Sequence, residues 1–223
     1  MVVAICLLLF CRVLANIPRY VEKEPKLLPL KINRYGQAKV LSPKEYSKIR
    51  KQLPHTWQKL LFEILWYTGE RVGAVAQLEW RYVYEKPGVA RDVILFNART
   101  RKAAAGKPAK TRTVPIHENL MEAIALYELP WKQTKWMFPG RDLDNHVWRQ
   151  TVDAALRSAC DRAGLGGLGI STHSFRRTLI TRLSDKGVSA RTIQQVTGHA
   201  SLNSVQNYID CDERKIKEAI DLL

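Results

Sequence analysis

The sequence predicts an α+β fold that is predominantly α-helical and contains one small antiparallel β-sheet. Beyond residue 41, apolar residues recur three or four apart through most of the chain, which is the spacing of one helix face. Two short β-rich runs interrupt this pattern near the middle. With 223 residues, 46% of them hydrophobic, the chain can bury a substantial core. We therefore expect one globular domain with an appendage.

The appendage is residues 1–40, an apolar segment followed by a linker or arm. Residues 2–10 are apolar and lead to a small residue, Ala15, in the outline of a secretory signal, but no basic residue precedes them. The run is too short to span a bilayer. An apolar helix packed on the domain, or a start codon inside a longer reading frame, is the preferred interpretation. Residues 16–40 carry three prolines and show no sustained periodicity of apolar residues, which indicates an extended connection.

The domain itself, residues 41–223, is expected to begin with a helix. Ser42 is suited to the N-cap, Pro43 to the first helical position, and Glu45 stands three residues after the cap. A core-facing helix that runs to about Thr68 should follow. Its apolar face is formed by Trp57, Leu60, Leu61, Ile64 and Leu65.

The predicted sheet pairs residues 92–97 with residues 111–116 across a connection rich in Lys, Ala and Gly. After the sheet, the chain should be helical again. The segments with helical spacing are residues 117–129, 145–164, 171–187, 189–198 and 212–223, several of which end at glycine. The last one is amphipathic and has an ordinary interpretation as a helix that packs on its own domain.

The charge favours a polyanionic partner. The chain has 36 Lys and Arg against 21 Asp and Glu, a formal charge of +15, although solubility alone is an alternative explanation. The four cysteines, Cys6, Cys11, Cys160 and Cys211, form no CxxC pair, and we interpret them as reduced thiols of a cytoplasmic protein. No HxH, HExxH or clustered Asp/Glu pattern is present, so we expect no metal site.

Three stretches carry residues suited to holding a phosphate. His173 and Arg176 lie one turn apart near a helix start, where the positive end of the helix dipole, guanidinium donors and an imidazole would meet. Arg71 follows a Thr-Gly break and opens a second apolar helix. Lys107 lies between the two strands, where a mobile tip can deliver an ammonium. Taken singly, each is more often simply a solvated surface residue.

A fourth stretch, residues 197–210, places a Gly-His pair ahead of a lone tyrosine, Tyr208. By itself it fits a helix-turn-helix that ends in a core aromatic. It also fits a reaction site in which Tyr208 is the nucleophile. The stretch alone does not distinguish these readings, and the upstream residues decide between them.

Together these stretches resemble the tyrosine recombinase (phage integrase) family over roughly residues 40–223. The catalytic domain of that family presents, in order, an arginine after a Thr-Gly turn, a hairpin lysine, His-x-x-Arg, Gly-His, and a tyrosine nine residues after that last histidine. This chain fills all six positions, with Arg71, Lys107, His173, Arg176, His199 and Tyr208. The conjunction is far more specific than any of its parts.

The chain departs from the family pattern at two positions. The family usually has an acidic residue three positions after the first arginine, where this chain has Ala74. Glu70 is adjacent to that arginine but is expected on a different face. Arg177 replaces the histidine that usually follows the second arginine, and so adds positive charge.

The resemblance implies a site-specific recombinase that cuts and rejoins DNA through a 3′-phosphotyrosyl intermediate, without metal or ATP. Tyr208 would attack the scissile phosphorus, while Arg71 and Arg176 would hold the non-bridging oxygens. By the same resemblance, Lys107 would protonate the departing 5′ oxygen, and His173 would assist proton transfer at the tyrosine. His199 would donate a hydrogen bond to the phosphate.

Other basic residues should contact the DNA backbone without reading its sequence. The expected contacts are Arg101, Lys102, Lys110, Arg112 and Arg177. Lys102 and Lys110 share the hairpin connection with Lys107, so each of the three is a candidate for the catalytic lysine.

The resemblance also implies partners: double-stranded DNA, and a homo-tetramer in which residues 212–223 are exchanged between protomers. The family adds a separate core-binding domain, for which the forty N-terminal residues are too few, so an accessory protein or separate domain is a further expected partner. The context would be a bacterial, phage or plasmid mobile element. The alternatives are a non-catalytic DNA-binding protein (a degenerate integrase or helix-turn-helix regulator) and a type IB-like topoisomerase.

Overall fold

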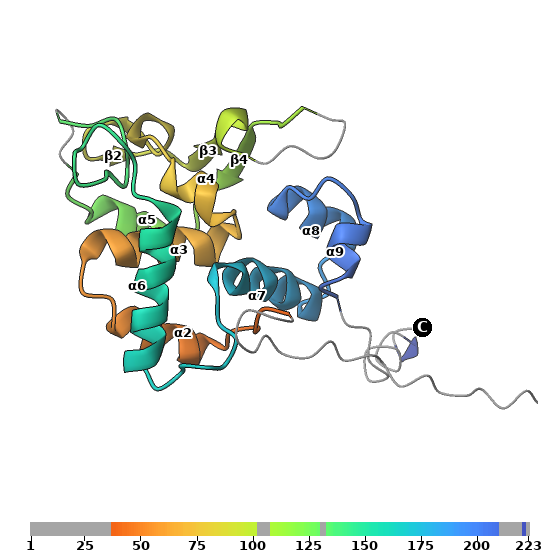
Figure 1. Cartoon of the computed structure of the whole chain (residues 1–223). Helices are drawn as coiled ribbons and strands as arrows, with labels where there is room; N and C mark the ends of the chain where they lie inside the picture. Colours follow the sequence, from red (N-terminus) through yellow and green to blue (C-terminus); the bar gives the residue numbers. More distant parts are fainter. Residues whose placement is uncertain (1–36, 102–107, 130–132, 210–219, 222–223) are drawn as a thin grey trace, which may run out of the picture.

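The computed structural model describes residues 37–101, 108–129, 133–209 and 220–221, and in these ranges the chain is mostly helical with two small antiparallel ribbons (Figure 1). The predicted fold class is confirmed. Most of the expected N-terminal arm and of the C-terminal helix lies outside the described residues, as do Lys102 and Lys107. Within the described ranges, no helix is long and apolar enough to cross a membrane.

The first described helix, α2 (Pro43–Lys51), begins as the sequence predicts. The Ser42 hydroxyl accepts a hydrogen bond from the Glu45 N–H at 3.2 Å, and Glu45 accepts one from the Ser42 N–H at 2.9 Å. This reciprocal capping box satisfies two N–H groups that the helix itself leaves without acceptors.

Replacing the cap is expected to weaken the domain measurably. Ser42→Ala should lower the free energy of unfolding by about 1 kcal/mol, because the Glu45 N–H loses its acceptor. Urea titration followed by circular dichroism would measure the difference. Ser47→Ala, an exposed change inside the same helix, is the matched control and should not destabilise, since alanine is the better helix former. Equal losses in both variants would contradict the capping role.

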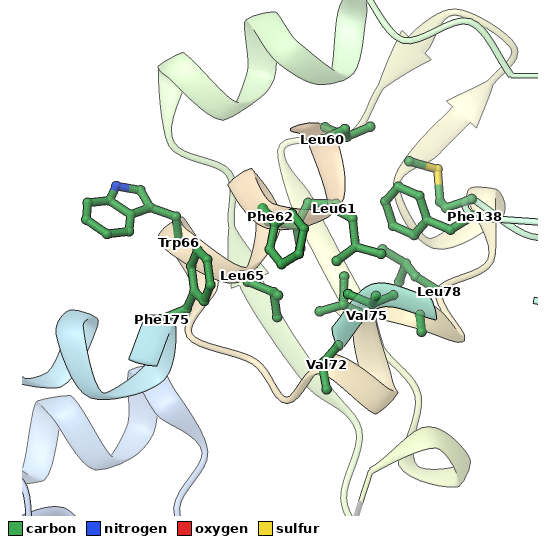
Figure 2. Packing of buried hydrophobic residues seen from close by; sticks show 14 of the residues in the cluster. Leu60, Leu61, Phe62, Leu65, Trp66, Val72, Val75, Leu78, Phe138 and Phe175 are labelled. Atoms are coloured by element: carbon green, nitrogen blue, oxygen red, sulfur yellow. The ribbon is translucent and has the colours of Figure 1, made fainter. Parts of the chain in front are cut away.

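Helix α3 (Thr56–Thr68) runs through the middle of the core, and Figure 2 shows its apolar side chains packed against neighbours from several elements. Phe62 is fully buried and stacks on Phe175 of α7 (Thr172–Asp185), with ring centroids 5.4 Å apart. The helix ends at Gly69, whose φ of 58° is left-handed. A Cβ at Gly69 would lie 2.7 Å from Leu179 Cδ2, so glycine is needed both for the turn and for the close approach of α7.

After Gly69 the chain forms a short helix and two ribbons. These are α4 (Val72–Ala76), η1 (Trp80–Tyr82), β1 (Tyr84–Lys86), β2 (Val89–Ala90), β3 (Val93–Phe96), η2 (Ala98–Thr100) and β4 (Arg112–Pro115). The predicted sheet is the β3–β4 pair, in antiparallel register from Val93 opposite Pro115 to Phe96 opposite Arg112. The β1–β2 ribbon was not predicted, since strands of two and three residues are too short to show a period.

Helices form the rest of the described chain: α5 (Glu118–Ala125), α6 (Arg149–Arg162), α7, α8 (Ala190–Thr197) and α9 (Asn203–Gln206). The first four confirm predicted helical segments. Figure 1 shows α8 and α9 beside α7, away from α2 and α6. Their buried contacts form a second, small cluster of Ile180, Ile193 and Val205, separate from the main core. Helix α7 therefore joins the main core to the helices that flank His199 and Tyr208.

Candidate active site

The site is built around the tight turn between α3 and α4. Gly69 reverses the chain, Glu70 is 1% exposed within the turn, and Arg71 is the N-cap residue of α4. The Glu70 carboxylate accepts a hydrogen bond from the Arg71 N–H at 2.8 Å, and the Glu70 N–H donates to the Thr68 hydroxyl at 3.2 Å. The turn therefore fixes the Glu70 carboxylate at the beginning of α4.

Three guanidinium groups from distant segments surround this carboxylate. Arg112 Nη1 lies 2.7 Å and Arg101 Nε 3.2 Å from Glu70 Oε2, and Arg176 Nη1 lies 4.0 Å from Oε1. Glu70 was expected on a different face from the usual acidic position of the family. The left-handed Gly69 places Glu70 in a turn outside α4, where its carboxylate lies against these guanidinium groups.

The electrostatics agree with an ionised Glu70. Burial by itself opposes ionisation, but Arg112, the Arg71 N–H, Arg101 and Arg176 outweigh it and lower the pKa of Glu70. Burial lowers the pKa of Arg112, with Glu70 opposing that shift. In the described part of the site, the guanidinium groups of Arg101, Arg112 and Arg176 lie against this one carboxylate, and the charge of Arg71 acts on Arg176, which leaves a positive excess.

Arg176 is 4% exposed, and backbone carbonyls fix the orientation of its guanidinium. Nη1 donates to the Gly69 carbonyl and Nη2 to the Thr197 carbonyl, both at 2.8 Å. Burial, followed by the charges of Arg71 and Arg112 and against that of Glu70, lowers the pKa of Arg176 to about 10. It is therefore still a cation at neutral pH. Arg71 is half-buried, and its side chain makes no hydrogen bond to a described residue, which leaves its donors for a ligand.

The hydrogen bonds around His199 assign its tautomer. The Thr197 hydroxyl donates its one hydrogen to the Ile193 carbonyl at 2.6 Å, so its oxygen accepts from His199 Nδ1–H, also at 2.6 Å. His199 Nε2 then has the lone pair and accepts from Arg176 Nε at 3.3 Å. In this state His199 supports Arg176, and the predicted hydrogen bond from His199 to a phosphate requires the other tautomer.

The environment keeps His199 neutral, and this has a measurable consequence. Burial, with the charges of Arg176, Arg71 and Arg112, lowers the pKa of His199 from 6.5 to about 3, against the opposing effect of Glu70. Between these two values the unfolded histidine binds a proton that the folded one does not, so stability is lost as the pH falls from 6.5 towards 3.

We expect His199→Gln to bind fewer protons on unfolding than the unchanged protein does at pH values between 3 and 6.5. The free energy of unfolding, measured by urea titration at several pH values between 4 and 7, should therefore fall less steeply with acid in the variant. Equal pH dependence in the two proteins would show that folded His199 is protonated like an unfolded one.

Tyr208 follows α9 and lies beside His199, with the two ring centroids 5.9 Å apart. It is half-buried against the small cluster of α7, α8 and α9, close enough to Arg176 to affect its pKa. The structure therefore brings together four of the six predicted catalytic residues: Arg71, Arg176, His199 and Tyr208. His173 is an exposed residue in the first turn of α7 and lines a cleft of about 560 Å³ against α6. Lys107 lies outside the described residues.

The predicted DNA contacts differ in how far their side chains are exposed. Arg101 and Arg112 turn inward to Glu70 with side chains only 8% and 6% exposed, so they are not the solvent-exposed contacts that the sequence suggested. Both were predicted as DNA contacts because they belong to the basic residues around the hairpin, and their acidic partner is 31 and 42 residues away in the sequence. Arg177 donates from Nη1 to the Ala38 carbonyl at 2.7 Å, and Lys110 is exposed.

Two supporting residues were missed by sequence reasoning. Glu70 was expected on a different face, and Thr197 appeared only as the first residue of the stretch 197–210. A signal for Glu70 was present, because it stands next to an arginine and between two apolar helices, and a carboxylate that is buried there needs a cation as its partner. Thr197 gives no such signal, since its role depends on the tertiary position of His199.

Comparison with solved structures shows the same fold in recombinases. The crystal structure of XerA recombinase matches with a TM-score of 0.64 at 22% identity, over 83% of this chain and 65% of that one. XerH site-specific recombinase bound to a palindromic difH substrate matches with a TM-score of 0.59 at 22% identity, over 81% of this chain and 52% of that one. At these identities the likeness establishes the fold alone.

Sequence relatives and a family model extend this likeness. The chain is 25% identical to tyrosine recombinase XerD of Agrobacterium fabrum over 76% of this chain and 53% of the relative. It is 28% identical to tyrosine recombinase XerA of Thermococcus onnurineus, over 90% and 67%. The chain thus spans about half the length of that XerD relative. The model of the phage integrase family matches residues 39–215, which include Arg71, Arg176, His199 and Tyr208, and the chain therefore belongs to that family.

Proposed function

We propose that this chain is the catalytic part of a site-specific DNA recombinase that cuts and rejoins DNA through a 3′-phosphotyrosyl intermediate, without metal or ATP. The observation that supports this most is the convergence of Arg71, Arg176 and His199 beside Tyr208 in a partly buried site with excess positive charge. Relatives named tyrosine recombinases support the same reaction class.

In the proposed reaction, the Tyr208 oxygen attacks the scissile phosphorus and the bond to the 5′ oxygen breaks. The tyrosine proton leaves with the help of His173, and Lys107 protonates the departing 5′ oxygen. One phosphodiester is exchanged for another, so the bond energy is kept for rejoining by a 5′ hydroxyl.

The arginines would supply what a metal ion supplies in other phosphoryl-transfer enzymes. The transition state spreads negative charge over the non-bridging oxygens, and preorganised donors stabilise that charge because they need not reorganise during the reaction. Arg176 is held by the carbonyls of Gly69 and Thr197, and the Arg71 guanidinium has donors left for a ligand.

The proposed partner is double-stranded DNA. Structures with this fold include XerH bound to difH substrate and a lambda integrase dimer bound to a core site. We further propose a homo-tetramer on DNA with residues 212–223 exchanged between protomers, and an accessory protein or separate core-binding domain. The action would take place in the cytoplasm on mobile-element DNA.

The test is the covalent intermediate. The chain, together with any in-frame extension of its reading frame, would be incubated with nicked suicide duplexes tiled across the DNA that flanks its coding sequence. A nick next to the cleavage point lets the short 5′-hydroxyl fragment diffuse away and traps the protein on the 3′ phosphate. We expect an adduct resistant to denaturant, with the DNA attached to the peptide that contains Tyr208. DNA binding without any adduct would favour the non-catalytic DNA-binding protein instead.

A further inference from the structure

The Glu70 carboxylate joins parts of the chain that are far apart in the sequence. We propose that Glu70 is a positioning residue for the phosphate site, and that Arg101 and Arg112 act with it as a clamp on the two ends of the β3–β4 connection. This inference rests on the proposed function, and it gives the two arginines a role other than binding DNA.

The first part of the argument is where the two arginines stand. Arg101 follows η2, at the start of the part of the connection that contains the candidate lysines, and Arg112 is the first residue of β4. Both guanidinium groups lie within 3.2 Å of the same oxygen, Glu70 Oε2. Arg101 Nη1 also donates to the Lys110 carbonyl at 2.6 Å. One carboxylate therefore holds together the two ends of the connection that contains the candidate lysines.

The same two arginines extend the clamp to the end of α8. Arg112 Nη2 donates to the carbonyls of Val196 and Thr68, and Arg101 Nη2 donates to the Gly198 carbonyl at 3.4 Å. Carbonyls at a helix C-terminus carry partial negative charge, and cations there are favourable. The clamp thus fixes the turn that leads directly into His199.

Close packing leaves this turn little freedom. Gly198 has a φ of 64°, and a Cβ there would lie 3.0 Å from Arg112 Cδ and collide with the Arg101 guanidinium. The backbone and the two guanidinium groups are therefore in contact. A shift of either arginine would displace the α8–α9 turn as well as the hairpin base.

Charge explains why the carboxylate is required. The Arg101 and Arg112 side chains are both less than a tenth exposed, and a buried cation that loses its partner is strongly destabilised. Without the Glu70 charge, these groups and Arg176 would repel one another and move towards water. The usual acidic position of the family is Ala74 here, only 2% exposed on α4, so the Gly69 turn supplies the carboxylate instead.

The first arm of the test compares Glu70→Gln with Glu63→Gln. Glu63 is a matched control, because it is also a buried glutamate paired with an arginine, Arg50, but it lies on α3 away from the cluster. On the duplex that traps the unchanged protein, the single-turnover rate of adduct formation should fall about 10²-fold in Glu70→Gln, as expected for misplaced reacting groups. The dissociation constant for that duplex should change less than twofold.

Glu63→Gln should keep the adduct rate of the unchanged protein, even where it lowers the melting temperature. Glu70→Asp keeps the charge, so its rate of adduct formation should be at least tenfold higher than that of Glu70→Gln. A Glu70→Gln protein that forms adduct at the unchanged rate, or loses rate only in proportion to its folded fraction, would overturn the proposal.

The second arm separates a clamp from a DNA contact and does not need cleavage. Removing one phosphate contact lowers the slope of log Kd against log salt concentration by about 1. Lys110→Gln, at an exposed residue, should show this loss, whereas Arg101→Gln should leave the slope unchanged. A slope lowered by about 1 in Arg101→Gln would overturn the clamp.

The two experiments also distinguish a failure of this inference from a failure of the proposed function. If the unchanged protein forms no adduct on any duplex, the recombinase proposal fails, while the salt dependence of Arg101→Gln still decides the placement of that residue. The same measurement decides alone if Glu70→Gln does not fold.

Discussion

Tyr208→Phe is expected to abolish the covalent DNA adduct while leaving the fold intact. The substitution removes only the phenolic oxygen, which is the proposed nucleophile, and no other described residue stands in its place beside His199 and Arg176. The Tyr208 hydroxyl makes no hydrogen bond to a described residue, so its loss should cost little stability. Denaturing gel electrophoresis of the trapped complex measures the adduct, and thermal unfolding checks the fold.

Tyr67→Phe is the matched control for this experiment. Its hydroxyl accepts a hydrogen bond from Asn119 at 3.2 Å, and its ring stacks on His117 at the side of α3. Adduct formation should continue at the unchanged rate in this variant. Persistent adduct in Tyr208→Phe would identify another nucleophile and refute the assigned role.

Arg176→Lys should give the second large loss, a fall of about 10²- to 10³-fold in the rate of adduct formation. Lysine keeps the positive charge, but it cannot donate to the Gly69 and Thr197 carbonyls, His199 and a phosphate in the fixed geometry of a guanidinium. Single-turnover cleavage of the suicide duplex measures the rate.

Stability should fall too, by about 1–3 kcal/mol, because a buried carbonyl loses its donor. Arg182→Lys on the same helix is the control. The Arg182 guanidinium lies 5.0 Å from the Trp66 ring centroid, outside the cluster, and its replacement should leave cleavage unchanged. Equal cleavage rates in Arg176→Lys and the unchanged protein would remove Arg176 from the reaction.

Local patterns were enough for most of the fold. The periodicity of α3 and α7, the capping residues of α2, and the two β-rich runs of β3 and β4 each act within a few neighbouring residues. The β1–β2 ribbon escaped prediction because its pairing depends on a turn at Pro87-Gly88 and on strands too short for a period. The sequence therefore predicts the elements whose cause is local.

The residues of the site also differ in whether local patterns were enough to predict them. Motif order identified Arg71, Arg176, His199 and Tyr208, which the structure brings together. Which way Arg101 and Arg112 point could not be read from composition, because basic residues in a hairpin are usually solvated. Their inward direction depends on the Glu70 carboxylate, which is more than thirty residues away in the sequence. It also depends on the left-handed backbone of Gly69, which places Glu70 in the turn.

The separate cluster of Ile180, Ile193 and Val205 packs the two helices that precede Tyr208, α8 and α9, against α7. A unit held by few buried side chains opens locally at a lower free energy than the main core, because its opening exposes less apolar surface. Arg101, Arg112 and Arg176 hold the end of α8 by hydrogen bonds, so α9 and Tyr208 are the part that we expect to open at a lower free energy than α3 and its neighbours. Occupancy of the arginine cluster by an anion would oppose that opening, since bound ligand stabilises the closed form by mass action. Tyr208 would thus be held most firmly when a phosphate is present to react with it.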